Sequence, residues 1–123
     1  MLYCIQVNQT ESILRKIEQQ MNAAISDNKN WQSGNTSVTF DPETNVSQVF
    51  LHGNHIADVG DNFIRLFDGG WQSVTTKSRL NAILQEHGMD GECVFQQKFE
   101  WFVRINTVQG MTTVPFFSSM RLG

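Results

Sequence analysis

The sequence predicts an α+β fold with an antiparallel sheet: one helix, about four strands, a second helix, and two or three C-terminal strands. Two observations support this prediction. Apolar residues recur at helical spacing near the N-terminus and again after residue 74, whereas the segments between and after them alternate in short runs bounded by turn residues. The chain has 123 residues, 40% of them hydrophobic, so we expect a single domain over residues 1–123.

The first helix is expected over residues 10–26. Its apolar positions form one face, made of Ile13, Leu14, Ile17, Met21, Ala24 and Ile25. Charged and amide side chains lie mostly on the other side. We therefore interpret this helix as a packing or oligomerisation element.

A meander of four strands is expected next, over residues 36–40, 46–52, 55–59 and 62–67. Pro42 marks the first turn, and Gly53-Asn54 predicts a second, tight turn. The second helix is expected to start near Thr75 or Thr76 and to end at Gly88. Residues 93–97, 101–105 and 111–117 follow as C-terminal strands, the last at a sheet edge because of Pro115.

Charge and cysteine content restrict the function. A formal net charge of −3 makes nucleic acid an improbable partner, because non-specific phosphate binding needs a basic surface. Cys4 and Cys93 are too few and too far apart for a disulfide framework, so we expect two reduced thiols. The sequence contains no membrane-spanning stretch and no signal peptide, which favours a cytoplasmic protein.

The run from Gly69 to Asn81 carries the strongest functional signal. Two glycines and Trp71 lead into a helix start that contains Thr75, Thr76, Lys77, Arg79 and Asn81. Free backbone N–H groups, hydroxyls and cations at such a place suit a phosphate. The alternative is an ordinary capped helix start with a solvated charged face. Lys77 and Arg79 lie about 200° apart on an ideal helix, so both reach one phosphate only near the helix end.

Other residues extend the predicted site. Trp71 either stacks on a nucleobase or packs in the core. If the protein is an enzyme, His52 is the candidate general base and Lys77 the charge stabiliser for metal-independent phosphodiester cleavage. Asn54, Gln96 and Lys98 are further candidate ligand-binding residues, with exposed sheet polarity as the alternative for the last two. No motif indicates a metal site, and no cofactor is expected.

The chain resembles a family of small tailed-phage proteins. The resemblance rests on Ser33-Gly34-Asn35-Thr36, Leu51-His52-Gly53-Asn54, Gly70-Trp71, the run from Thr75 to Asn81, and Val94-Phe95-Gln96 before an aromatic strand, and it covers roughly residues 31–105. In the family pattern a lysine directly follows the glutamine, but here Gln97 intervenes before Lys98, which puts a role for that lysine in doubt. The resemblance implies a phage origin and expression in the cytoplasm of an infected bacterium.

Together these features predict a counter-defence protein. Its ligand would be a phosphate-containing nucleotide immune signal, such as a cyclic dinucleotide or an ADP-ribose derivative, which the protein binds and in one version of the hypothesis cleaves. A homo-oligomer is expected, because a small chain has little concave surface of its own. The alternative is a non-enzymatic interaction protein that binds a host or phage protein.

Overall fold

The computed structural model describes residues 12–123, with side chains from residue 16 onward. Its elements follow in the order α2 (Ser12–Ser26), β1 (Trp31–Ser33), β2 (Thr36–Asp41), β3 (Val46–Leu51), β4 (Asn54–Val59), β5 (Ile64–Leu66), α3 (Val74–His87), β6 (Cys93–Gln97), β7 (Glu100–Thr107), β8 (Gly110–Pro115) and β9 (Met120–Leu122). The predicted α+β class and order of elements are confirmed.

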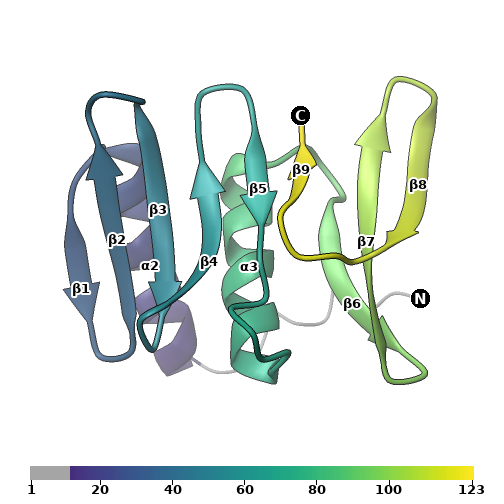
Figure 1. The fold of residues 1–123 in the computed structure, drawn as a ribbon, viewed down its shortest axis with the longest axis horizontal. Helices are drawn as coiled ribbons and strands as arrows, with labels where there is room; N and C mark the ends of the chain where they lie inside the picture. Colours follow the sequence, from purple (N-terminus) through teal and green to yellow (C-terminus); the bar gives the residue numbers. More distant parts are fainter. Residues whose placement is uncertain (1–11) are drawn as a thin grey trace.

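The strands form two antiparallel sheets (Figure 1). One has six strands in the order β1-β2-β3-β4-β5-β9, and the other has three in the order β6-β7-β8. Both helices lie on the same side of the six-stranded sheet, behind it in Figure 1, and they contact each other. Within residues 12–123, neither helix covers the opposite face of that sheet.

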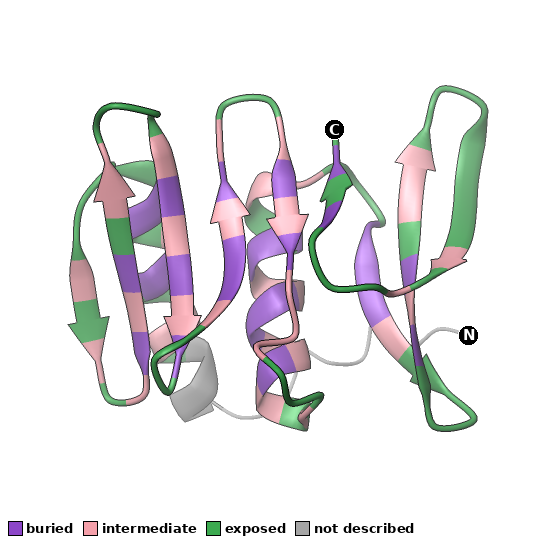
Figure 2. Cartoon of the chain, in the orientation of Figure 1, coloured by how far each residue is buried: buried purple, intermediate pink, exposed green. Residues whose placement is uncertain are grey.

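The core lies between the helices and the six-stranded sheet. The apolar face of α2 contributes Met21, Ala24 and Ile25, as the helical periodicity predicted. These residues and the buried positions of α3 belong to one hydrophobic cluster with the inward residues of β2 to β5 and β9. Buried positions alternate with more accessible ones along β3, β5 and β9, as Figure 2 shows. Burying this apolar surface is the main term that stabilises the arrangement.

Three local features differ from the prediction. Strands β1 and β9 are additional, and β9 adds the C-terminal residues to the edge of the six-stranded sheet beside β5. The β3–β4 turn consists of His52 and Gly53, with φ of 54° and 78°, so His52 is a turn residue and Asn54 begins the next strand. Helix α3 starts at Val74, because the Ser73 side chain accepts a hydrogen bond from the backbone N–H of Thr76.

The expectation of reduced thiols is wrong at Cys93, which is buried on β6 and disulfide-bonded. Cys4, the other cysteine of the sequence, lies outside the described residues. Two cysteines far apart along a chain form no recognisable motif, so only the fold decides whether they pair. None of the described helices is long and apolar enough to cross a bilayer.

Candidate functional site

The bend before α3 is held by its own backbone and by Asp68. The Asp68 carboxylate accepts hydrogen bonds from the Gly70 N–H at 2.8 Å and from the side chain of Gln72 at 3.3 Å, while its carbonyl accepts from the Trp71 N–H. Gly69 and Gly70 both have positive φ. A Cβ on Gly69 would also lie 3.0 Å from the Cβ of Asn54. The bend therefore requires glycine at position 69 and packs directly against the start of β4.

This bend presents Trp71 to solvent. The Trp71 side chain is 73% exposed, and Val74 on the first turn of α3 is 77% exposed. Trp71 is therefore not the core residue that the alternative interpretation would make it. A large exposed ring on a hydrogen-bonded bend loses little freedom on binding, which is typical of contact residues.

A hollow of about 110 Å³ lies beside the ring. Its lining residues are Leu51, His52, Asn54, Ile56, Asp68, Gly69, Trp71, Ser73 and Thr76. We call this hollow, together with the exposed Trp71 and Val74, the Trp71 face. Four of the predicted site residues meet here, namely His52, Asn54, Trp71 and Thr76. Among the described residues, the lining contains no lysine or arginine, and Asp68 contributes a carboxylate.

The threonines at the start of α3 serve mainly to cap the helix. The Thr76 hydroxyl lies 2.9 Å from the Ser73 hydroxyl and 3.4 Å from the Trp71 carbonyl, so this side chain ties the cap to the bend. Thr75 is half-buried on the same turn. The alternative interpretation of this segment, a capped helix start, therefore describes Thr76 well.

Lys77 points away from the hollow. Its Nζ donates to Oε1 of Gln96 on β6 at 3.4 Å and lies 6.0 Å from the centre of the Trp101 ring. Desolvation by burial lowers the pKa of Lys77 from its ordinary value. Within the described residues no carboxylate lies within ion-pair distance of this ammonium group. Lys77 and Gln96 are therefore in contact, and neither of them lines the hollow that His52 lines.

Arg79 is part of the scaffold. Its side chain is 1% exposed and forms an ion pair with Glu18 of α2, with Nη1 and Oε2 separated by 3.0 Å. Nε donates to the Thr36 hydroxyl at 3.0 Å, and Nη2 donates to Oδ1 of Asn35 at 3.3 Å. Because three acceptors occupy this guanidinium, it connects α3 to α2 and β2 and does not face the hollow.

Asn81 is structural as well. Its side-chain amide donates to the Val94 carbonyl at 2.9 Å, and its side-chain oxygen accepts from the Val94 N–H at 2.6 Å. These two hydrogen bonds satisfy the backbone N–H and carbonyl of Val94 on the edge strand β6, and they connect β6 to α3. Lys98 lies at the exposed β6–β7 turn with φ of 53° and takes no part in these contacts.

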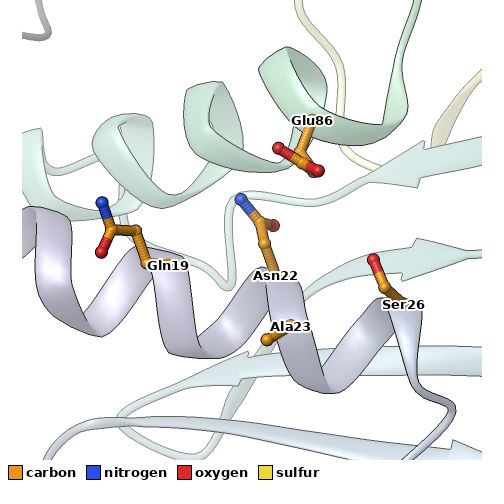
Figure 3. A pocket seen from close by; sticks show the side chains of 5 residues that line it. All are labelled: Gln19, Asn22, Ala23, Ser26 and Glu86. Carbon is orange, nitrogen blue, oxygen red and sulfur yellow. The ribbon is translucent and has the colours of Figure 1, made fainter.

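A second concavity lies between α2 and α3 (Figure 3). It measures about 220 Å³ and is lined by Gln19, Asn22, Ala23, Ser26 and Glu86. The Asn22 side-chain amide donates to the Ala82 carbonyl of α3 at 3.1 Å, whereas its Oδ1 is buried without a hydrogen-bond partner among the described residues. The lining has no cation, so the groove offers nothing that would hold a phosphate.

Sequence reasoning missed Asp68, Ser73 and Val74 as members of the Trp71 face. A signal for two of them was present. An aspartate two residues before a glycine commonly accepts from the backbone of its own turn, and a serine before a helix commonly caps it. Val74 could not be recognised, since nothing local distinguishes an exposed valine from a buried one.

The comparisons with known proteins agree with the predicted origin. The sequence model described as Kyanoviridae Gp96 protein matches residues 14–123. Neither the search of curated proteins nor that of solved structures found a match. Because the match covers most of the sequence, the chain belongs to the Kyanoviridae Gp96 protein family, a family of phage proteins.

Proposed function

We propose that this phage protein is a non-enzymatic binding protein that docks a protein partner through the Trp71 face. The observation that supports this proposal most directly is Trp71, which is 73% exposed and lies beside a small, mainly apolar hollow. Pockets for small-molecule ligands usually enclose about 300–1,000 Å³. The hollow of about 110 Å³ is smaller, and suits one side chain of a partner.

The charge of the protein favours a basic partner. The chain carries a formal net charge of −3, and the hollow includes the Asp68 carboxylate but no cation. A partner with an apolar anchor side chain and surrounding lysines or arginines would complement both features. The partner would be a host or phage protein in the infected cell, and interference with a host defence is the role we favour. Disulfides are rare in a reducing cytoplasm, so the disulfide at Cys93 is unusual for a protein of the infected cell's cytoplasm.

The arrangement gives less support to catalysis. Metal-independent cleavage of a phosphodiester needs a base and a cation at one centre. His52 lines the hollow, whereas Lys77 contacts Gln96 on β6, and Arg79 is buried in its ion pair. The described residues of one chain therefore do not bring the candidate base His52 and the candidate cation Lys77 to one centre.

Replacing Trp71 tests the docking proposal. Wild type, Trp71→Ala and the control Phe99→Ala, which removes an aromatic ring that is 93% exposed at the β6–β7 turn, are used to recover partners from infected cells. A photo-crosslinker at position 71 then identifies the contacting protein, and its affinity is measured with purified components. We expect Trp71→Ala to weaken binding at least about 30-fold and Phe99→Ala to leave it within about threefold. Equal affinity of Trp71→Ala and wild type would reject the Trp71 face as the docking site.

Nucleotide capture is the second candidate, favoured by one observation. Lys77 is a half-buried cation without a carboxylate partner in the described part of the chain, and it lies one residue after Thr76 of the hollow. Titration with cyclic dinucleotides and ADP-ribose, followed by heating and analysis of the released molecules, distinguishes capture from cleavage. Saturable binding that Trp71→Ala and Lys77→Ala both abolish would replace the docking proposal with this one.

A further inference from the structure

Two arginines lie side by side on the sheet face that neither described helix covers. Arg65 of β5 is directly opposite Arg121 of β9 in the antiparallel register. Their strand neighbours Ile64, Leu66, Met120 and Leu122 are all buried in the core. Because successive side chains alternate between the faces of a strand, Arg65 and Arg121 belong to the opposite face of the sheet.

The described residues do not neutralise this arginine pair. Asp58 of β4 is the register partner of Arg65, but its carboxylate is engaged by His55, with Nε2 and Oδ1 separated by 2.6 Å. Among the described residues, no carboxylate lies within ion-pair distance of either arginine. The Nε of Arg65 is also buried without a hydrogen-bond acceptor. Like charges directly opposite each other destabilise a sheet, so the pair needs another explanation than stability.

One aromatic ring positions both guanidinium groups. The Cζ of Arg121 lies 4.6 Å from the centre of the Phe63 ring, and the Cζ of Arg65 lies 5.9 Å from it. The ring itself sits on Gly60, where an added Cβ would approach a Phe63 ring carbon to 2.3 Å. The Gly60 N–H donates to the Phe63 carbonyl at 2.9 Å, which fixes this turn. Stacking on a positioned ring restricts the two side chains before any ligand arrives.

We propose that Arg65 and Arg121 form a binding site for a phosphate group. Arginine presents a planar fork of donors that matches phosphate oxygens and is weakly hydrated, so two neighbouring guanidinium groups can share one tetrahedral anion. The anion would remove the repulsion between them. With a net charge of −3 the protein repels long polyanions, so the expected ligand is a small phosphate ester or diphosphate.

The site shares no residue with the Trp71 face, so the two proposals are tested separately. The probe is inorganic pyrophosphate, titrated calorimetrically into the full chain at constant ionic strength. The variants are Arg65→Gln, Arg121→Gln and the control Arg104→Gln, which removes an exposed arginine on β7 of the other sheet. We expect saturable binding that each site variant weakens about ten- to hundredfold and that the control changes less than about twofold.

Thermal unfolding gives an independent measurement of the same proteins. Pyrophosphate should raise the melting temperature of wild type and Arg104→Gln but not of the site variants. Parallel titrations with ADP and with a short oligothymidylate compare a free nucleotide with a single-stranded nucleic acid as the source of the phosphate. The ligand that binds more tightly identifies the source. Absence of binding to wild type, or equal losses in Arg104→Gln and the site variants, would overturn the proposal.

Discussion

Lys77 and Arg79 are two residues apart on α3, yet their surroundings differ completely. Arg79 is 1% exposed, and its donors reach Glu18, Thr36 and Asn35. Lys77 is only half-buried, and its polar contact among the described residues is with Gln96. A cation in a polar motif stabilises the fold when the fold supplies hydrogen-bond acceptors for its donors. When the fold does not supply such acceptors, the cation is available to a ligand.

The largest expected effect comes from removing Arg79. Arg79→Met keeps similar volume but removes the cation that pairs with the Glu18 carboxylate, which is only 13% exposed and keeps just the Ser78 hydroxyl as a donor among the described residues. The Thr36 hydroxyl also loses the hydrogen bond from Arg79. Breaking a buried ion pair by deleting one partner typically costs about 3–5 kcal/mol. Urea unfolding should show a loss of this order in the free energy of unfolding.

A double variant sharpens this result. Replacing both members of a buried ion pair by apolar residues is often close to neutral, so Glu18→Met with Arg79→Met should be more stable than Arg79→Met alone. If the single variant loses less than about 1 kcal/mol, Arg79 is not the structural residue that its contacts indicate.

A smaller loss is expected at Asn81, two residues after Arg79 on the same helix. Asn81→Ala leaves the N–H and the carbonyl of Val94 without partners, and because both hydrogen bonds are only part-buried we expect the low end of the usual range, about 1 kcal/mol for each group. Urea unfolding measures the total, and hydrogen exchange should show faster exchange of the Val94 amide. Gln85→Ala, an exposed position on α3, is the matched control and should change stability little. Unchanged exchange at Val94 would contradict the proposed attachment of β6 to α3.

The smallest effect is expected at Lys77, with the opposite sign. Burial lowers the folded-state pKa of Lys77 below its ordinary value of 10.5, so the unfolded state holds more protons between these two values. The free energy of unfolding therefore rises as the pH increases through that interval, and below it the buried charge is unfavourable. Lys77→Met should slightly raise stability at neutral pH, and the gain should shrink as the pH approaches 10.5.

Thermal melts of Lys77→Met between neutral and alkaline pH test this expectation, with the exposed Lys29→Met as control. A stability loss at neutral pH would show that the contacts of Lys77 with Gln96 and Trp101 outweigh its desolvation. In that case Lys77 would belong to the scaffold with Arg79, and the contrast between the two residues would disappear.

The sequence pattern that indicated the family turns out to describe contacts between distant segments. Asn35 and Thr36 accept hydrogen bonds from Arg79, and the His52 N–H donates to the Asn35 carbonyl at 2.7 Å. Three parts of the pattern therefore meet at one structural network. Reading the polar residues of α3 as one binding cluster was reasonable locally, but their side chains point to different partners around the helix.

The sequence by itself determined the fold class and most of the secondary structure in its order, β1 and β9 excepted, since periodicity, turn residues and caps act over a few neighbouring residues. It also predicted the bend that leads into α3. Only the tertiary structure decided that Arg79 and Asn81 hold the scaffold, that β9 joins β5, and that Arg65 meets Arg121. Those outcomes depend on which distant segments become neighbours, because a buried donor or charge takes its role from the acceptors that the fold brings to it.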